Sequence, residues 1–177
     1  MQSINMKKVN CPKAIFIMGL PGTGKTYLAN ELSKSIAATH ISSDAIRKII
    51  KKRGQYQQDD KQEVYREMQK QMEAILEKNE AVILDATFYQ QKVRDEFQSL
   101  AKQFTKDIFW ILTTADEAII KTRVSKKRPD SEADFKVYQL IKNQFEPIQS
   151  EYLEIKTDEL PLKENIEIVK KYCKIVT

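Results

Sequence analysis

One stretch near the N-terminus decides the fold: Gly19-Leu20-Pro21-Gly22-Thr23-Gly24-Lys25-Thr26. It matches the pattern G-x-x-x-x-G-K-[ST], follows an apolar run at residues 14–18 and opens a segment with helical spacing, which is the context that this motif requires. Glycines let the backbone wrap with its N–H groups inward, and the start of the helix adds a partial positive charge. The stretch therefore predicts a loop that cradles the phosphates of a nucleotide.

The polar residues of this loop have expected roles. The Lys25 ammonium should reach the β- and γ-phosphates of the nucleotide, and the Thr26 hydroxyl should ligate Mg²⁺. ATP and Mg²⁺ are therefore the expected cofactors, although the loop itself does not distinguish ATP from GTP. The expected ATP-binding residues are Gly19, Pro21, Gly22, Thr23, Gly24, Lys25, Thr26 and Tyr27.

Three missing features indicate which reaction this nucleotide-binding loop serves. The only glycine beyond the loop is Gly54, and the D-x-x-G segment of a GTPase would need aspartate where Lys51 stands. No N-K-x-D segment for reading guanine is present either. A hydrolytic motor usually carries an acid directly after the strand aspartate, but Asp85 is followed by Ala86. We therefore expect phosphoryl transfer to another molecule and not to water.

Outward from the loop, apolar runs alternate with amphipathic segments. Strands are predicted at 14–18, 39–42, 81–84, 107–113 and 152–156, and helices at 25–37, 44–52, 62–78, 91–104, 116–127, 132–145 and 162–175, with a glutamine-rich loop at 54–62. This alternation predicts an α/β fold, a three-layer P-loop NTPase sandwich with a parallel sheet of about five strands. The second strand is expected near the first, a helical lid at about 121–145, and a single domain over residues 1–177.

Composition excludes several other classes. The 177 residues carry a net charge of +5, which permits a polyanionic partner without demanding one. A single histidine, His40, makes a histidine-ligated metal site and a Ser-His-Asp triad improbable, and we interpret it as strand-edge structure. The two cysteines match no metal spacing. No apolar run approaches the ~18 residues of a bilayer span. The expected location is the cytoplasm, with no membrane partner.

The acceptor side of the reaction is predicted from the segment Ser42-Ser43-Asp44-Ala45-Ile46-Arg47, which follows the second strand. A carboxylate there can accept the proton of an acceptor hydroxyl, so Asp44 is the candidate general base. Arg47 lies three residues further on, on the same helical face, and can hold a phosphate of the acceptor. The alternatives are that Asp44 or Ser43 caps the helix and that Arg47 is a solvated helix residue.

Two further segments contribute candidate site residues. Asp85 ends a buried strand, where it can hold Mg²⁺ through water or orient the acceptor. Thr87 can line the acceptor pocket together with Phe88 and Tyr89, although core packing is as good an interpretation of Phe88. The stretch 121–128 carries five positive charges in eight residues, and its arginines Arg123 and Arg128 can stabilise the transferring phosphoryl group. The alternative for Asp85 is a carboxylate that belongs to a loop or caps a helix. The alternative for the stretch 121–128 is a solvated basic face.

These segments, in this order, resemble the small P-loop kinases related to polynucleotide 5′-hydroxyl kinase and the zeta-toxin-like kinases. The resemblance runs from about residue 13 to 148 and includes the segment 82–88 with Arg94. It implies that Asp44 is the base, that Arg47 holds the acceptor's phosphate, and that the lid arginines contact the ATP phosphates. Asp85, Thr87 and Arg94 are the further residues expected to bind the substrate. The spacing in the lid leaves open whether Arg123 or Arg128 is the catalytic arginine.

Two classes of function remain open. The first is an ATP-dependent kinase that acts on a phosphate-bearing hydroxyl acceptor, with a nucleic-acid 5′-hydroxyl as the leading candidate and a nucleotide sugar, metabolite or antibiotic as the alternative. The second is a nucleotide-binding ATPase or switch that acts through a partner by its basic lid and glutamine-rich loop. Asp44 together with Arg47 favours the first, because a switch needs no acceptor base. The sequence identifies neither the acceptor nor the oligomeric state.

Overall fold

The computed structural model describes residues 12–50, 58–125 and 135–175. Five parallel strands form one sheet in the order β2-β3-β1-β4-β5. Their bounds are β1 Ala14–Gly19, β2 Thr39–Ser42, β3 Val82–Asp85, β4 Ile108–Thr114 and β5 Leu153–Lys156. Every residue of β1 and β3 is buried, and apart from Gly19 and Asp85 at their carboxyl ends these residues are apolar, as expected of strands inside a parallel sheet.

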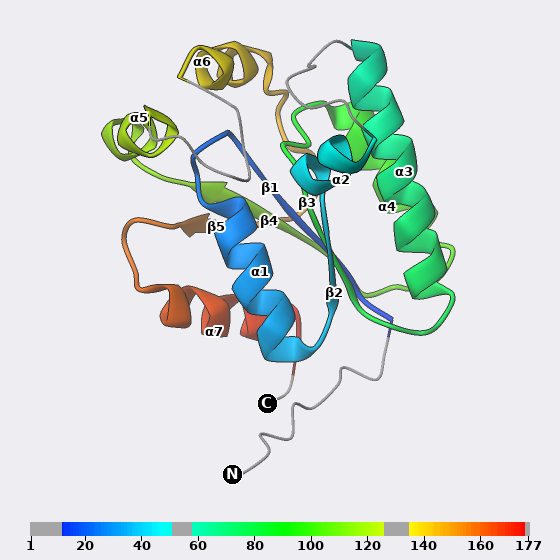
Figure 1. Ribbon diagram of the computed structural model, residues 1–177. Helices are drawn as coiled ribbons and strands as arrows, with labels where there is room; N and C mark the ends of the chain where they lie inside the picture. The colour runs from blue at the N-terminus through cyan, green and yellow to red at the C-terminus, as the bar shows by residue number, and fades with distance from the viewer. Residues whose placement is uncertain (1–11, 51–57, 126–134, 176–177) are drawn as a thin grey trace.

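Helices cover both faces of the sheet, as Figure 1 shows. Their bounds are α1 Lys25–Ile36, α2 Ser43–Ile49, α3 Gln58–Leu76, α4 Gln91–Ala101, α5 Glu117–Ser125, α6 Phe135–Gln144 and α7 Leu162–Tyr172. On one face α2, α3 and α4 pack against the sheet, with Met68 and Met72 of α3 fully buried, as their helical spacing predicts. On the other face α1 and α7 pack through Leu28, Leu32 and Val169. The predicted three-layer α/β sandwich with five parallel strands is therefore confirmed.

A separate, small apolar cluster lies at the carboxyl end of the sheet. Ile120 and Val124 of α5 pack with Tyr138 of α6 in a small cluster that also contacts Leu20 of the loop after β1. In Figure 1 α5 lies beside that loop and α6 lies above it. They form the described part of the predicted lid, whose residues 126–134 lie outside the described part of the chain.

The strand order and the bounds of two helices differ from the prediction. The strand β3 lies between β1 and β2, so the second strand is one place further from the first than expected. The helix α3 begins at Gln58, so residues 58–62 of the predicted loop 54–62 are helical, and three of these five residues are glutamine or lysine, which are good helix formers. The helix α2 ends at Ile49.

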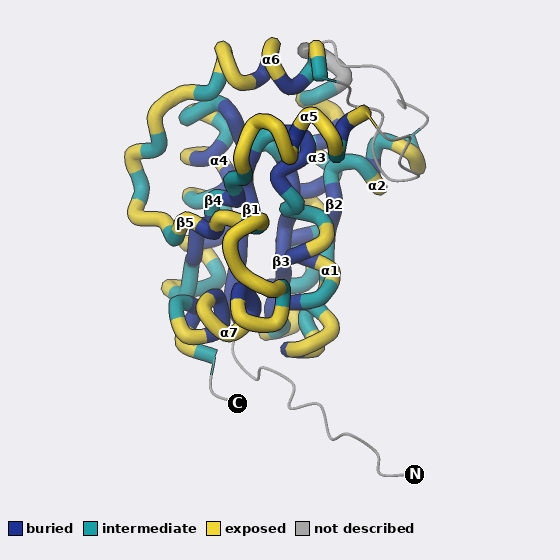
Figure 2. The backbone as a smooth tube through the Cα atoms, turned by 90° about the vertical axis from the view of Figure 1, so that its left-hand side faces the viewer, coloured by how far each residue is buried: buried dark blue, intermediate teal, exposed yellow. Residues whose placement is uncertain are grey.

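Figure 2 shows the sheet as the buried centre of the molecule. Within the described ranges, no helix combines the length and apolarity that a membrane span would need.

Candidate active site

Threonine side chains hold the phosphate loop closed. The Thr23 hydroxyl donates to the carbonyl of Leu20 at 2.8 Å and lies 2.8 Å from the Thr113 hydroxyl, while Thr157 donates to the carbonyl of Thr23 at 2.8 Å. The exposed fraction of Thr23 is 2%. Its side chain therefore shapes the loop from inside, because the hydroxyl is buried among protein oxygens, and ATP binding by Thr23 stays a prediction.

The helix α5 rests directly on the phosphate loop. Gly22 has a φ of +86°, and a Cβ atom there would lie 2.7 Å from Cγ1 of Val124. Arg123 of α5 also contacts the phosphate loop, since its Nη1 donates to Oγ1 of Thr157 at 2.9 Å and to the Gly22 carbonyl at 3.3 Å. The structure thus brings Arg123 to the nucleotide loop, as expected for a lid arginine. Arg128 lies outside the described residues.

The start of α1 offers backbone N–H groups to an anion. Gly24 precedes the helix in a left-handed conformation, and no side chain makes a capping hydrogen bond there. The N–H groups of the first helical turn have no carbonyl partner within the helix, and together with the helix dipole they attract a phosphate. The Tyr27 side chain is 64% exposed, so the backbone N–H is the part of this residue that suits the phosphates.

Thr26 and Asp85 form a small oxygen site beside the loop. The Thr26 hydroxyl donates to Oδ1 of Asp85 at 3.1 Å, and Asp85 ends β3 with only 1% of its surface exposed. Mg²⁺ in nucleotide sites takes one or two protein oxygens and fills its other positions with phosphate oxygens and water. The described residues contain no cluster of three or more histidine, cysteine, aspartate or glutamate side chains that would form a dedicated metal cage. The donor set therefore fits magnesium bound together with a nucleotide.

The sequence analysis missed a neighbour of this site. Nε2 of His40 lies 2.8 Å from Oδ2 of Asp85, and the ring is mostly buried. The pairing of β2 with β3, which aligns Ser42 with Asp85, brings the two side chains together. The sequence does show a polar residue, His40, on the strand that precedes Asp44. Its contact with Asp85 could be predicted only if the pairing of β2 with β3 were known.

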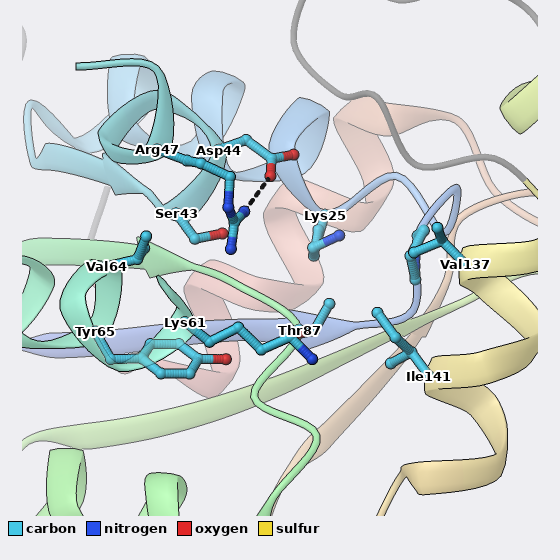
Figure 3. A pocket seen from close by; sticks show the side chains of 11 residues that line it. Lys25, Ser43, Asp44, Arg47, Lys61, Val64, Tyr65, Thr87, Val137 and Ile141 are labelled. Carbon is cyan, nitrogen blue, oxygen red and sulfur yellow. Dashed lines mark hydrogen bonds and ion pairs between the residues drawn. The ribbon is translucent and has the colours of Figure 1, made fainter. Parts of the chain in front are cut away.

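An enclosed cavity of about 50 Å³ lies beside the phosphate loop, and Figure 3 shows its walls. Its lining residues are Pro21, Lys25, Ser43, Asp44, Arg47, Lys61, Val64, Tyr65, Thr87, Val137 and Ile141. Five of the predicted site residues are therefore brought together here: Pro21 and Lys25 of the phosphate loop, two residues from α2 and one from the segment after β3. The placement of Lys25, Asp44, Arg47 and Thr87 around one cavity agrees with the sequence analysis.

The pair on α2 is arranged as a carboxylate next to a cation. Nη1 of Arg47 donates to Oδ1 of Asp44 at 3.3 Å, with most of the Arg47 side chain buried and the Asp44 side chain partly open. The helix begins at Ser43, Ser42 occupies the cap position, and no side chain makes a capping hydrogen bond. The capping interpretation of Asp44 and Ser43 is therefore wrong, because both residues lie inside the helix.

The cavity is also lined by three residues of α3 that the sequence analysis missed, Lys61, Val64 and Tyr65. Nζ of Lys61 donates to Oη of Tyr89 at 3.1 Å and lies 4.7 Å from the centre of its ring. Burial raises the pKa of Tyr65, although a hydrogen bond with Thr87 lowers it. Lys61 was missed because it lies in the predicted loop 54–62. Residues 58–63 are all polar, so no apolar spacing marked them as part of α3.

The neighbours of Thr87 have other functions. Phe88 is fully buried and stacks on Tyr65 with ring centres 5.9 Å apart, so of the two interpretations core packing is the correct one. Tyr89 does not line the cavity but supports Lys61 from behind. The remaining wall is apolar and consists of Val137 and Ile141 of α6. A space of this size holds only a few water molecules.

Arg94 does not belong to the acceptor site, and the prediction that it does is wrong. Its exposed fraction is 1%, and it does not line the cavity. Its guanidinium donates to the carbonyls of Phe88 at 2.6 Å, Glu146 at 3.0 Å and Pro147 at 2.7 Å. Burial lowers its pKa. Arg94 therefore joins α4 to the segment after α6, because its donors are aimed at main-chain oxygens within the protein.

Comparisons with known proteins agree with this geometry. The chain is similar to a sugar kinase from a Janibacter species, with a TM-score of 0.73 and 18% identity over 93% of this chain and 96% of that one. It is also similar to a gluconokinase from Sinorhizobium meliloti, with a TM-score of 0.69 and 16% identity over 92% of both chains. The APS kinase CysC from Mycobacterium tuberculosis, solved with AMPPNP and APS, gives a TM-score of 0.74 and 15% identity over 93% of this chain and 98% of that one.

These three neighbours are P-loop kinases, and at such identities the likeness shows the fold. A search of curated proteins finds no match. No finding singles out polynucleotide kinases, so that part of the expected resemblance stays a prediction. The sequence matches the model of the AAA_33 family, described as an AAA domain, over residues 15–148. Since the match covers most of the chain and includes the phosphate loop, β3 and both described lid helices, the chain belongs to this family.

Proposed function

We propose that this protein is an ATP-dependent phosphotransferase that moves the γ-phosphate to a hydroxyl group of an acceptor. One observation carries the proposal: Lys25 of the phosphate loop lines the same cavity as Asp44 and Arg47 of α2. A protein that only binds or hydrolyses ATP needs no carboxylate and cation pair beside the γ-phosphate position. The APS kinase solved with AMPPNP supports ATP as the donor in this fold.

The proposed reaction assigns a role to each residue. Asp44 accepts the proton of the acceptor hydroxyl. The hydroxyl oxygen then forms a bond to the γ-phosphorus, while the bond from that phosphorus to the bridging oxygen breaks and ADP leaves. Lys25 stabilises the charge on the transferring group, and Arg123 supports the loop at Gly22. Charge on the β- and γ-phosphates is neutralised by Mg²⁺ when it is bound, with Thr26 and Asp85 as the residues that would hold it.

The charges of the cavity favour an anionic acceptor. Of the residues that line it, three are cationic (Lys25, Arg47 and Lys61) and one, Asp44, is acidic. Because Lys25 serves the nucleotide, Arg47 and Lys61 can hold a phosphate on the acceptor a few ångströms from the reacting hydroxyl. A nucleic-acid 5′ end fulfils this requirement and remains our leading candidate, and small phosphorylated metabolites fulfil it too. The basic residues 51–53, which would extend the site along a strand, lie outside the described residues.

The test is a transfer assay with γ-labelled ATP against a panel of acceptors: a 5′-hydroxyl oligonucleotide, transfer RNA, nucleoside phosphates and uncharged sugars. We expect label in an organic product for at least one phosphate-bearing acceptor, and no label when Asp44→Asn replaces the wild type. Release of labelled phosphate to water at one rate with every acceptor would contradict phosphotransfer and favour the ATPase or switch.

A further inference from the structure

A chain of hydrogen bonds connects two points of α1 through the edge of the sheet. The Asn30 side-chain amide lies 2.9 Å from Nδ1 of His40, and Nε2 of His40 lies 2.8 Å from Oδ2 of Asp85. The other oxygen of that carboxylate accepts a hydrogen bond from Thr26, at the first turn of α1. The His40 ring on β2 thus stands between a solvent-facing residue of the helix and the oxygen site beside the phosphate loop.

We propose that His40 is a positioning residue that fixes the orientation of the Asp85 carboxylate for magnesium. This inference rests on the proposed function, in which Thr26 and Asp85 hold Mg²⁺ with the nucleotide. It goes beyond that function because it gives a role to the only histidine of the chain, which does not line the cavity.

The need for such a residue follows from the geometry of Asp85. Rotation about the bond from Cβ to the carboxylate has broad minima, so packing alone does not fix the plane of the two oxygens. Thr26 holds Oδ1 only, and the residue is almost completely buried, so Oδ2 needs its own donor. The N–H of His40 supplies that donor and leaves the other lone pairs of both oxygens available to water or metal. Residues that orient metal-binding groups in this way change metal affinity by about 10- to 100-fold when removed.

The surroundings of His40 are suited to holding the ring still. With Nε2 facing a carboxylate, the proton belongs on that nitrogen, and in the neutral ring Nδ1 is then an acceptor. Rotating the Asn30 amide by half a turn presents its NH₂ group to Nδ1 without any change of shape. The ring is therefore held from both sides, by α1 and by β3, while the main chain of β2 pairs with β3.

The experiment compares AMPPNP binding in EDTA with binding in excess Mg²⁺ by isothermal titration calorimetry, using the full chain. In the wild type we expect Mg²⁺ to tighten binding. In His40→Ala we expect affinity in EDTA to stay unchanged, while the tightening by Mg²⁺ falls about 10-fold or more. In His40→Gln we expect most of the tightening to return, because the glutamine Nε2 can donate from the position of the ring nitrogen. Thr39→Ala, at an exposed position of the same strand, is the matched control.

The other outcomes are equally decisive. Equal loss of AMPPNP affinity with and without Mg²⁺ would mean that His40 only supports the loop, and unchanged tightening would mean that Asp85 needs no orientation; either result overturns the proposal. If His40→Ala lacks a cooperative thermal transition, His40→Leu replaces it, since leucine fills the space without a donor. Tight, Mg²⁺-dependent AMPPNP binding without transfer to any acceptor would contradict the phosphotransfer and leave the assignment of His40 standing.

Discussion

The Asp44 carboxylate and the Arg47 guanidinium lie 3.3 Å apart in the wall of the cavity that Lys25 also lines. Both come from one turn of α2, and the described side of the lid, Val137 and Ile141, closes the space opposite them. A proton acceptor and an anion-binding group are thus presented together to whatever enters the cavity.

For Asp44→Asn we expect turnover to fall by about 10²- to 10⁴-fold, because the amide keeps the size of the carboxylate but cannot take the acceptor proton. Affinity for AMPPNP should stay unchanged. Rapid-quench turnover and calorimetric binding measure the two quantities separately. Loss of nucleotide affinity with turnover preserved at saturation would place Asp44 in the nucleotide site instead.

For Arg47→Ala we expect the KM of a 5′-hydroxyl oligonucleotide to rise about 10- to 100-fold, the cost of losing a hydrogen bond from a charged donor. Affinity should also fall with salt concentration, at a slope near two to four released counterions in the wild type and lower in the variant. Lys48→Ala removes the same charge from an exposed position of α2 and serves as the control. An equal effect of Arg47→Ala on an uncharged acceptor would argue against the phosphate-binding role.

Lys25→Ala should abolish phosphotransfer while the thermal unfolding midpoint stays close to that of the wild type. The loss of a charge-assisted contact to the transferring phosphoryl group should cost about 10³-fold or more in rate. Lys34→Ala, on the exposed side of the same helix, should leave the rate unchanged. A Lys25→Ala rate within tenfold of the wild type is incompatible with the proposed site.

Arg94→Leu should lower the free energy of unfolding by about 2 kcal/mol or more, because it leaves the buried Phe88 carbonyl without its donor and removes the hydrogen bonds to the carbonyls of Glu146 and Pro147. Urea denaturation followed by circular dichroism measures the loss. Lys92→Ala, at an exposed position of the same helix, should change it by less than about 0.5 kcal/mol. A stable Arg94→Leu protein with a raised acceptor KM would restore Arg94 to the acceptor site.

The thiol of Cys173 should not react with iodoacetamide at pH 8 in the native protein. The side chain is fully buried, and burial raises its pKa to about 12, so almost no thiolate forms. A Cys11→Ser background removes the other cysteine, and mass spectrometry in native buffer and in guanidinium chloride measures the labelling. Labelling at one rate in both conditions would show that α7 does not bury the thiol.

Local features of the site were predictable. The phosphate loop was found from eight contiguous residues, because its function depends on backbone conformation, and glycines at 22 and 24 supply the positive φ angles that the wrap requires. Asp44, Arg47 and Asp85 were found because each follows a strand or lies one helical turn from such a residue. Arg94 was misplaced for the opposite reason, since the spacing of α4 does not say which of two adjacent residues, Val93 or Arg94, faces inward.

The sequence by itself therefore determined the alternation of strands and helices, the loop and the candidate base, since each depends on neighbours within one turn or one strand. Only the tertiary structure decided that β3 separates β1 from β2, which brings His40 to Asp85, and that α3 extends far enough to bring Lys61 beside Arg47. The physical reason is that strand order and the rotation of a helix about its axis are set by the packing of whole apolar faces. Hydrogen bonds between residues distant in sequence follow from that packing and leave no local pattern of their own.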